Sequence, residues 1–119
     1  MDDLKIRPRR SFIFTPGLKP EMFPKAIASG ADIVCIELED GIAMQDKDEA
    51  RATTIKALKT LEINESTEIV VRINCQRTKF GLLDLEAFIS SKTHFVVRVN
   101  QRVTFLNLNF ASTGPSKAL

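Results

Sequence analysis

The sequence of 119 residues is 44% hydrophobic and 27% charged, which is ordinary for a soluble globular domain and excludes a disordered chain. All 15 acidic residues lie at or before Glu86, and the four basic residues beyond it are not clustered, so no nucleic-acid partner is indicated. The N-terminus leads into no long apolar run, and we therefore expect neither a signal peptide nor a membrane span, and a cytoplasmic location.

The first third of the sequence predicts two strands joined by a helix. Residues 11–15 form the first strand, which Pro16-Gly17 ends before the helix begins. Four consecutive apolar residues at 33–36 predict a second strand that is buried on both faces, as in parallel sheets. Because side chains alternate along a strand, Glu37 and Glu39 extend one of these apolar faces at the C-terminal end.

The middle of the sequence predicts a second helix and a third strand. Asp46 and Glu49 have the spacing of a capping box at the start of a helix that reaches about residue 61. Residues 68–75 predict a strand with Arg72 and Asn74 on one face and apolar residues on the other. The polar face therefore lies at the C-terminal end of this strand as well.

The last part of the sequence continues the alternation. Residues 82–89 predict a short third helix with Asp84 and Glu86 exposed, and residues 94–110 predict one long or two short strands. Short strands alternating with helices favour right-handed crossovers and a parallel sheet. The fold class indicated by the pattern is α/β.

Polar side chains follow two neighbouring strands of this predicted sheet. If the strands lie side by side in chain order, Glu37 and Glu39 meet Arg72 and Asn74 at one edge, where α/β folds place their sites. Arginine at this place can hold a carboxylate or an oxyanion through two parallel hydrogen bonds, although an internal salt bridge is the simpler interpretation. Lys19, in the loop after the first strand, lies at the same edge and could meet a phosphate.

Other chemistries find little support. Cys35 and Cys75 lie within apolar strand-like runs, which favours reduced core thiols over a disulfide or a metal pair. His94 is the single histidine and is interpreted as a surface or strand-edge residue. The motifs of zinc proteases, serine hydrolases and P-loop nucleotide-binding proteins are absent from the sequence.

The order and spacing of several motifs resemble the citrate lyase beta subunit-like family, also called the HpcH/HpaI aldolase family. The motifs are Thr15-Pro16-Gly17, Ser29-Gly30-Ala31-Asp32, Glu37-Leu38-Glu39-Asp40-Gly41, Val71-Arg72-Ile73-Asn74 and Gly81-Leu82-Leu83-Asp84-Leu85. The resemblance covers roughly residues 7–91. It implies the N-terminal part, about three to four βα units, of a (β/α)₈ TIM barrel, and hence a truncated barrel.

The resemblance also implies an activity, since members of this family are Mg²⁺-dependent lyases. They make or break C–C bonds of citryl-CoA, malyl-CoA and related acids, and they usually form homo-oligomers. Their partners are small molecules, namely acyl-CoA thioesters and dicarboxylates. Carried over to this sequence, Arg72 binds the substrate carboxylate or carbonyl oxygen with Asn74 beside it, Glu39 and Asp40 are candidate catalytic acids, and Lys19 is a candidate contact for a CoA phosphate.

The sequence departs from the family pattern in three places. Glu37 replaces the usual aspartate, and Lys19 stands where many members have arginine. The Pro-Lys-x-Glu-like motif that ends the fourth strand and supplies a metal ligand is missing, so we expect no metal ligand within this chain. Residues 1–91 are therefore expected to form a partial, catalytically incomplete barrel, with residues 92–119 as an atypical tail.

Two other functions remain open. The first is a non-catalytic remnant that binds CoA or a subunit of the full-length enzyme. The second is a phosphoreceiver-like signalling module, which is disfavoured because the third strand ends in Arg72-Ile73-Asn74 and lacks a phosphoacceptor aspartate. An open partial barrel is expected to self-associate or to be partly molten, because Phe12 or Ile13 with Ile33, Cys35 and Val70 would face water.

Overall fold

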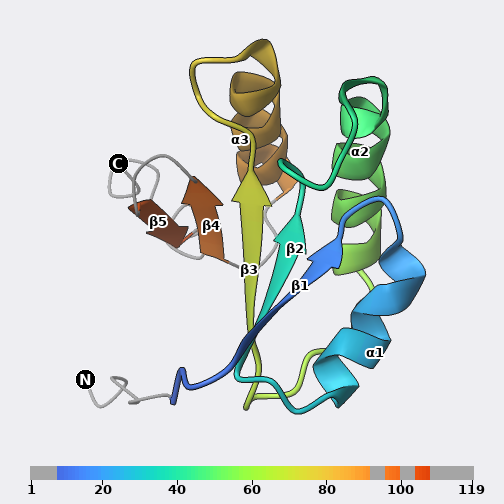
Figure 1. The fold of residues 1–119 in the computed structure, drawn as a ribbon, viewed down its shortest axis with the longest axis vertical. Helices are drawn as coiled ribbons and strands as arrows, with labels where there is room; N and C mark the ends of the chain where they lie inside the picture. Colours follow the sequence, from blue (N-terminus) through green and yellow to red (C-terminus); the bar gives the residue numbers. More distant parts are fainter. Residues whose placement is uncertain (1–7, 92–95, 100–103, 108–119) are drawn as a thin grey trace.

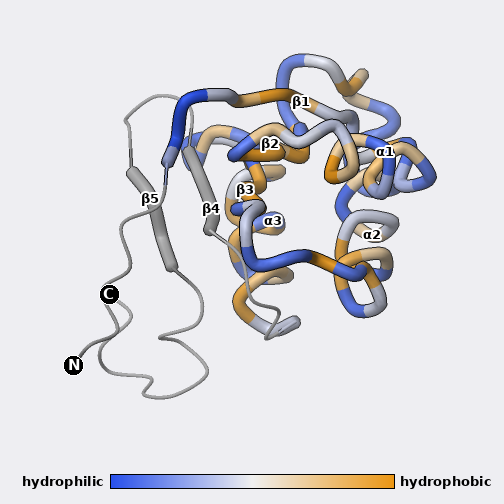
Figure 2. The backbone as a smooth tube through the Cα atoms, turned by 90° about the horizontal axis from the view of Figure 1, so that it is seen from below, coloured by the Kyte–Doolittle hydropathy of each residue, from blue (hydrophilic) through white to orange (hydrophobic). Residues whose placement is uncertain are grey.

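The computed structural model describes residues 8–91, 96–99 and 104–107. It is an α/β structure in which one sheet carries the helices on one of its faces (Figures 1 and 2). In chain order the elements are β1 (Phe12–Pro16), η1 (Pro20–Met22), α1 (Phe23–Ala28), β2 (Ile33–Glu37), η2 (Met44–Asp46), α2 (Lys47–Leu58), β3 (Glu68–Ile73), α3 (Lys79–Ser91), β4 (Val96–Val99) and β5 (Thr104–Asn107). No helix in the described part of the chain combines the length and the apolar character that crossing a bilayer requires.

The strands lie in the sheet in the same order as in the chain, β1-β2-β3-β4-β5. β1 to β4 run parallel, and β5 pairs with β4 in the antiparallel direction. The prediction of a parallel sheet is therefore confirmed for the first four strands, and the region after residue 94 forms two short strands rather than one long one. In register, Glu37 lies opposite Pro16 on one side and opposite Arg72 on the other.

One face of the sheet packs against the helices. Its core combines alternate residues of β2 and β3 with apolar residues of all three helices, including the fully buried Phe23 of α1, Ala50 of α2 and Phe88 of α3. This is the face that the two-residue period of the strands predicted. Burial on both faces also accounts for the continuous apolar run of β2, all of which is buried.

The other face of the sheet is more open. Ile33, Cys35 and Val70 form a small cluster on it, flanked by Phe12 and Phe14 of β1, which are 38% and 52% exposed. The expectation that Ile33, Cys35 and Val70 would face water is wrong, because all three are buried. Phe12 and Phe14 lie opposite Ile33 and Cys35 in the β1–β2 register, so the aromatic rings of the edge strand flank the centre of this face.

Three local expectations differ from the structure. α2 begins at Lys47 as the sequence predicted, but Asp46 at its N-cap makes no side-chain capping hydrogen bond. α3 begins at Lys79, three residues earlier than expected. Asp84 of α3 was expected on the exposed side, whereas its side chain is fully buried and ion-paired with Arg51 of α2. The interpretation of His94 falls outside the described residues, as does most of the tail at residues 92–119, of which only 96–99 and 104–107 are described.

Candidate functional site

The centre of the site is an ion pair between the ends of two neighbouring strands. Glu37 is the last residue of β2, and Arg72 lies opposite it on β3. Arg72 donates from Nε to Oε1 of Glu37 at 2.8 Å and from Nη2 to Oε2, so the two planar groups meet side by side. Both side chains are largely buried, at 13% exposed for Arg72 and 8% for Glu37. Such a bidentate geometry fixes the orientation of the guanidinium as well as its position.

The same glutamate also organises the turn that follows β2. The backbone amides of Glu39 and Asp40 donate to its two carboxylate oxygens at 3.1 and 3.0 Å. From the other side, buried Lys47 of α2 donates from Nζ to the carbonyl oxygens of Leu38 at 3.3 Å and Glu39 at 2.9 Å. The carboxylate of Glu37 therefore binds the amides of the acidic turn, and the ammonium group of Lys47 binds its carbonyl oxygens.

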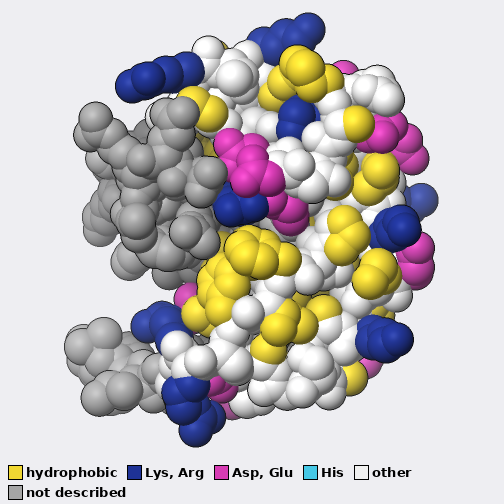
Figure 3. All heavy atoms as spheres, in the orientation of Figure 1, with side chains coloured by type: hydrophobic (Ala, Val, Ile, Leu, Met, Phe, Trp, Pro, Cys, Tyr) yellow, Lys and Arg dark blue, Asp and Glu magenta, His cyan; other side chains and the backbone are white. Residues whose placement is uncertain are grey.

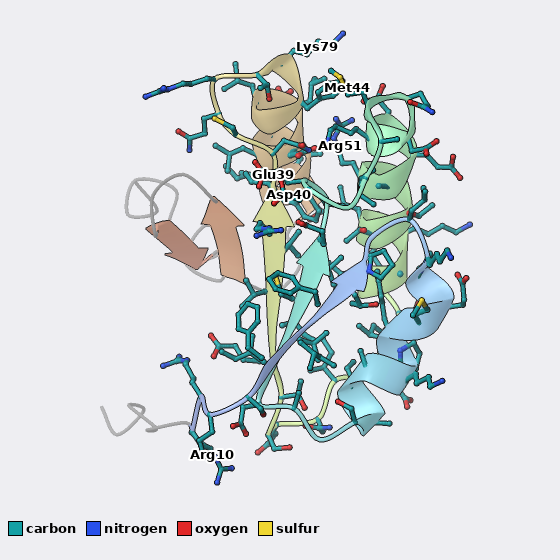
Figure 4. The ribbon with its side chains drawn as sticks, in the orientation of Figure 1. Arg10, Glu39, Asp40, Met44, Arg51 and Lys79 are labelled. Carbon is teal, nitrogen blue, oxygen red and sulfur yellow. The ribbon has the colours of Figure 1, made fainter. Side chains whose placement is uncertain are left out.

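Arg72 contacts three further side chains of the cluster. Its Nη2 donates to Oδ2 of Asp40 at 3.4 Å, and its Nε lies 3.9 Å from Oε1 of Glu39. Its guanidinium carbon lies 4.8 Å from the ring centroid of Phe14 on β1, which is a cation–π distance. Figure 4 shows Glu39 and Asp40 together beyond the ends of the central strands, and in Figure 3 acidic and basic side chains gather beside a hydrophobic patch.

The three acids differ in their electrostatic state. Burial opposes the charged form of Glu37, but the hydrogen bonds from Arg72 and from the turn amides outweigh it and lower the pKa of this carboxyl. For Glu39, burial and the neighbouring Asp40 charge raise the pKa, and Arg72 compensates only in part. The hydrogen bonds that Arg72 donates to Glu37 raise the pKa of Arg72, so the guanidinium stays charged. One buried oxygen of this cluster, Oε1 of Glu39, has no hydrogen-bond partner among the described residues.

These residues do not make a magnesium site by themselves. Mg²⁺ requires near-octahedral oxygen ligands, usually including carboxylates from different elements. Both oxygens of Glu37 are occupied by Arg72 and the turn amides, which leaves Glu39 and the exposed Asp40 from a single turn. No group of three potential metal-ligating side chains occurs among the described residues. The donor set of residues 8–91 therefore does not fit the metal without ligands from elsewhere.

The structure brings only part of the predicted site together. Glu39, Asp40 and Arg72 lie in one cluster, as their positions after β2 and near the end of β3 predicted. Lys19 is exposed on the loop after β1 and is not among the residues that contact Arg72. Asn74 is buried and donates from Nδ2 to Asp84 at 2.7 Å instead of facing the cluster.

Sequence reasoning missed three polar residues that support the site. Lys47, Arg51 and Asp84 are all largely buried, and each bonds to a group distant in sequence. The helical spacing contained a signal, since Asp84 lies three residues after Gly81 and four before Phe88, both buried. A charged residue on the buried side of a helix requires a partner, which here is Arg51.

The sequence model of the HpcH/HpaI aldolase/citrate lyase family matches residues 10–103. This chain belongs to that family. The match includes β1 to β4 and the whole of the cluster around Arg72.

Individual relatives agree with this assignment. The citrate lyase subunit beta of Leuconostoc mesenteroides subsp. cremoris is 39% identical over 85 residues, which cover 71% of this chain and 28% of the relative. The L-malyl-CoA/beta-methylmalyl-CoA lyase of Cereibacter sphaeroides is 42% identical over 79 residues, which cover 66% of this chain and 24% of the relative. The chain thus spans about a quarter of the length of these relatives.

The solved structures include a similar fold. The crystal structure of the protein CitE from Mycobacterium tuberculosis in complex with magnesium and pyruvate aligns with a TM-score of 0.61 and 34% sequence identity. The alignment covers 76% of this chain and 36% of CitE. The sheet and helices described above therefore match part of a CitE-like fold.

Proposed function

We propose that this chain carries the anion-binding part of a carbon–carbon lyase acting on acyl-CoA or hydroxy-acid substrates. The observation that carries the proposal is Arg72, a buried guanidinium fixed by Glu37 on the open face of the sheet, at the C-terminal ends of parallel strands. In α/β folds this end carries the sites. Citrate lyase subunit beta and malyl-CoA lyase are the relatives whose names support the reaction class.

Arg72 in this proposal holds a carboxylate or carbonyl oxygen of the substrate. Its described hydrogen bonds use Nε and Nη2, so the two N–H groups of Nη1 are the donors expected to meet the ligand. Glu37 and Phe14 fix the plane of the guanidinium. Glu39 and Asp40, which lie beside it, are the candidate catalytic acids, and the raised pKa of Glu39 suits a group that exchanges a proton.

The proposal has four further parts, drawn from the family and from the sequence. Residues 1–91 form the first βα units of a (β/α)₈ barrel, and residues 92–119 are an atypical tail. The substrate is a CoA thioester, with Lys19 near its phosphates, and the lyase works as a cytoplasmic homo-oligomer. Mg²⁺ serves the reaction, with ligands from outside residues 8–91, because the acids around Arg72 do not form a metal site.

Ligand binding by the 119-residue chain tests the role of Arg72. Malonate, an unreactive dicarboxylate, is titrated into the isotope-labelled chain and followed by NMR. Lysine keeps the positive charge but lacks the planar guanidinium that can donate two parallel hydrogen bonds, so Arg72→Lys should weaken malonate binding by about tenfold or more. Arg10→Lys is the matched control, because Arg10 lies at the opposite end of the sheet, and it should leave the affinity unchanged. Equal affinities of Arg72→Lys and the parent chain would refute the proposal.

Turnover separates the enzyme from the non-catalytic alternative. We expect the purified 119-residue chain to bind malonate without cleaving citryl-CoA or malyl-CoA, since Glu39 and Asp40 come from one turn and Glu37 is occupied by Arg72. Measured cleavage of either thioester with added Mg²⁺ would contradict this expectation and show that the residues outside the described ranges complete the site. Binding of CoA with no effect of Arg72→Lys would favour the remnant.

A further inference from the structure

Behind the end of β3 lies a second polar cluster, centred on the carboxylate of Asp84. Its side chain is fully buried on α3. Oδ1 accepts a hydrogen bond from Nε of Arg51 at 2.7 Å, and Oδ2 accepts two from Asn74, from the backbone amide at 3.0 Å and from Nδ2 at 2.7 Å. One carboxylate therefore joins α2, α3 and the residue that follows β3.

The arginine of this cluster is as enclosed as the one in the site. Arg51 is 13% exposed, and its Nη2 lies 3.0 Å from Oδ1 of Asp48, which is 73% exposed. Asp48 therefore adds a screened contact, whereas Asp84 is the buried partner that compensates the charge of Arg51. Removing either member of the buried pair leaves an uncompensated charge among apolar neighbours.

The backbone around Asn74 is tightly enclosed as well. A Cβ atom on Gly81 would lie 2.0 Å from the carbonyl oxygen of Cys75, so the first turn of α3 packs directly on the chain that leaves β3. Two residues before Asn74, the carbonyl oxygen of Arg72 accepts a hydrogen bond from the amide of Leu38 at 3.0 Å. The backbone is thus anchored on both sides of Ile73.

We propose that Arg51, Asp84 and Asn74 form a positioning network that holds the C-terminal end of β3, and through it the guanidinium of Arg72, in place. This inference rests on the proposed role of Arg72 as the anion-binding group. It assigns Asn74 a positioning role in place of a contact with substrate. Asn74 acts through the backbone of β3, and Arg51 acts one step further away, through the carboxylate of Asp84.

The network has a specific physical consequence for the site. The bidentate bond between Arg72 and Glu37 requires the end of β3 to keep its register with β2, because the two residues are opposed across the strands. If Asp84 no longer holds Asn74, the last residues of β3 can open locally while the apolar core on the helix face stays packed. The bond from Nε of Arg72 to Glu37 then opens more often.

The test measures that opening directly by NMR on the labelled 119-residue chain. Exchange of the Arg72 Nε proton with water is recorded at mildly acidic pH, where Glu37 stays ionised, and the signal is assigned by its loss in Arg72→Lys. Exchange of the backbone amide of Ile36, in the core of the sheet, reports global unfolding in the same sample. The ratio of the two rates separates a local effect on Arg72 from a general loss of stability.

Asp84→Asn should raise this ratio by about tenfold or more, because the one acceptor oxygen that remains is contested by the charged Arg51 and by Asn74. Asp48→Asn removes the exposed acid near Arg51 and should leave the ratio within about twofold. In Arg51→Met/Asp84→Asn no buried charge remains, and the side-chain amide oxygen introduced by Asp84→Asn can still accept from Asn74, so the ratio should return towards the parent value. If Asp84→Asn does not fold, Asn74→Ala keeps the Arg51–Asp84 pair and should still raise the ratio.

Two results would overturn the network. One is an unchanged ratio in a folded Asp84→Asn or Asn74→Ala variant, which would make the cluster structural only. The other is a double variant whose ratio stays as high as that of Asp84→Asn. Neither measurement uses a ligand, so a failed malonate experiment would refute the anion-binding role and leave the outcome of this test unaffected.

Discussion

The two ends of the sheet carry arginine–carboxylate pairs of very different character. At the N-terminal ends of the strands, Arg9 bonds to Glu68 at 2.8 Å and Arg10 to Asp32 at 3.3 Å, with the arginines 58% and 80% exposed. At the C-terminal ends, Arg72 is buried and has Glu37, Glu39 and Asp40 around it. Figure 4 shows Arg10 at one end and Glu39 and Asp40 at the other.

The difference shows what separates a structural ion pair from a candidate site. At the N-terminal end each carboxylate has its own arginine, and water screens the two exposed guanidinium groups. At the C-terminal end three carboxylates share one guanidinium, and a buried oxygen of Glu39 is left without a hydrogen-bond partner among the described residues. An excess of buried acceptors is unfavourable for stability, which is the pattern expected where a protein binds something.

The largest effect should come from removing the shared cation. Arg72→Met leaves Glu37 buried beside two other acids and should lower the free energy of unfolding by about 3 kcal/mol. Arg10→Met at the other end should cost less than about 1 kcal/mol, because Arg10 itself is exposed and Asp32 keeps the hydrogen bonds from the backbone amides of Arg10 and Ser11. Urea melts of both variants at neutral pH measure the difference, and similar losses would show that the two ends are electrostatically equivalent.

The second largest loss of stability should come from a substitution in the loop after β1. A Cβ atom on Gly17 would lie 2.4 Å from Cδ2 of Leu38 and 2.6 Å from Oγ1 of Thr54, so Gly17→Ala should cost about 2 kcal/mol through overpacking. Gly41→Ala is the matched control, since its Cβ would make only an ordinary contact with Glu37 at 3.7 Å. Thermal unfolding of the two variants gives the comparison. If Gly17→Ala is as stable as the parent chain, the loop can shift to accommodate the added methyl group.

The pH dependence of stability should differ among the acids. The pKa of Glu37 is lowered by Arg72, and that of Asp32 by Arg10, so each stabilises the fold above its unfolded-state pKa. This stability is lost as the pH falls through the folded pKa values. Glu39 contributes to stability in the opposite direction, because its pKa is raised in the folded state. Its contribution is present below the unfolded-state pKa and is lost as the pH rises to the folded-state pKa.

Glu39→Gln isolates this second contribution. The variant should gain stability at neutral pH, by less than about 1 kcal/mol, and should match the parent chain at acidic pH, where Glu39 is protonated in both states. Urea melts across the acidic to neutral range measure the difference. A loss of stability at neutral pH would show that the ionised carboxylate of Glu39 is favourably placed.

The smallest effect should come from the aromatic ring beneath the guanidinium. Phe14→Leu removes the cation–π contact with Arg72 but keeps an apolar side chain, and should cost about 0.5 kcal/mol. Phe12→Leu changes a ring that packs edge-on against Phe14, and it provides the comparison. If both variants lose the same amount in urea melts, the contact with Arg72 adds nothing.

The strands and the location of the site were the predictable parts of this molecule. The apolar run of β2 and the alternation in β3 placed Glu37 and Arg72 on one face at one edge. The two-residue period is a local property of each strand, and the helix between the strands favours a right-handed crossover to a parallel neighbour. The burial of Asp84 was not predicted because its partner Arg51 is 33 residues away, although its spacing from Gly81 and Phe88 places it on the buried side of α3. Lys47 was missed for a different reason: its acceptors lie only nine and eight residues earlier, but they are backbone carbonyls, which no residue type marks in the sequence.

The order of the strands has a consequence for how the chain acquires its structure during synthesis. Each of the strands β2 to β5 pairs with the strand that precedes it in the chain, so its first pairing partner has already been synthesised when it emerges. A nascent chain can therefore extend the sheet one strand at a time as it leaves the ribosome, with each helix covering the sheet soon after it emerges. We expect ribosome-bound chains that have exposed residues up to the end of α3 to protect Ile36 from proteolysis before β4 has emerged.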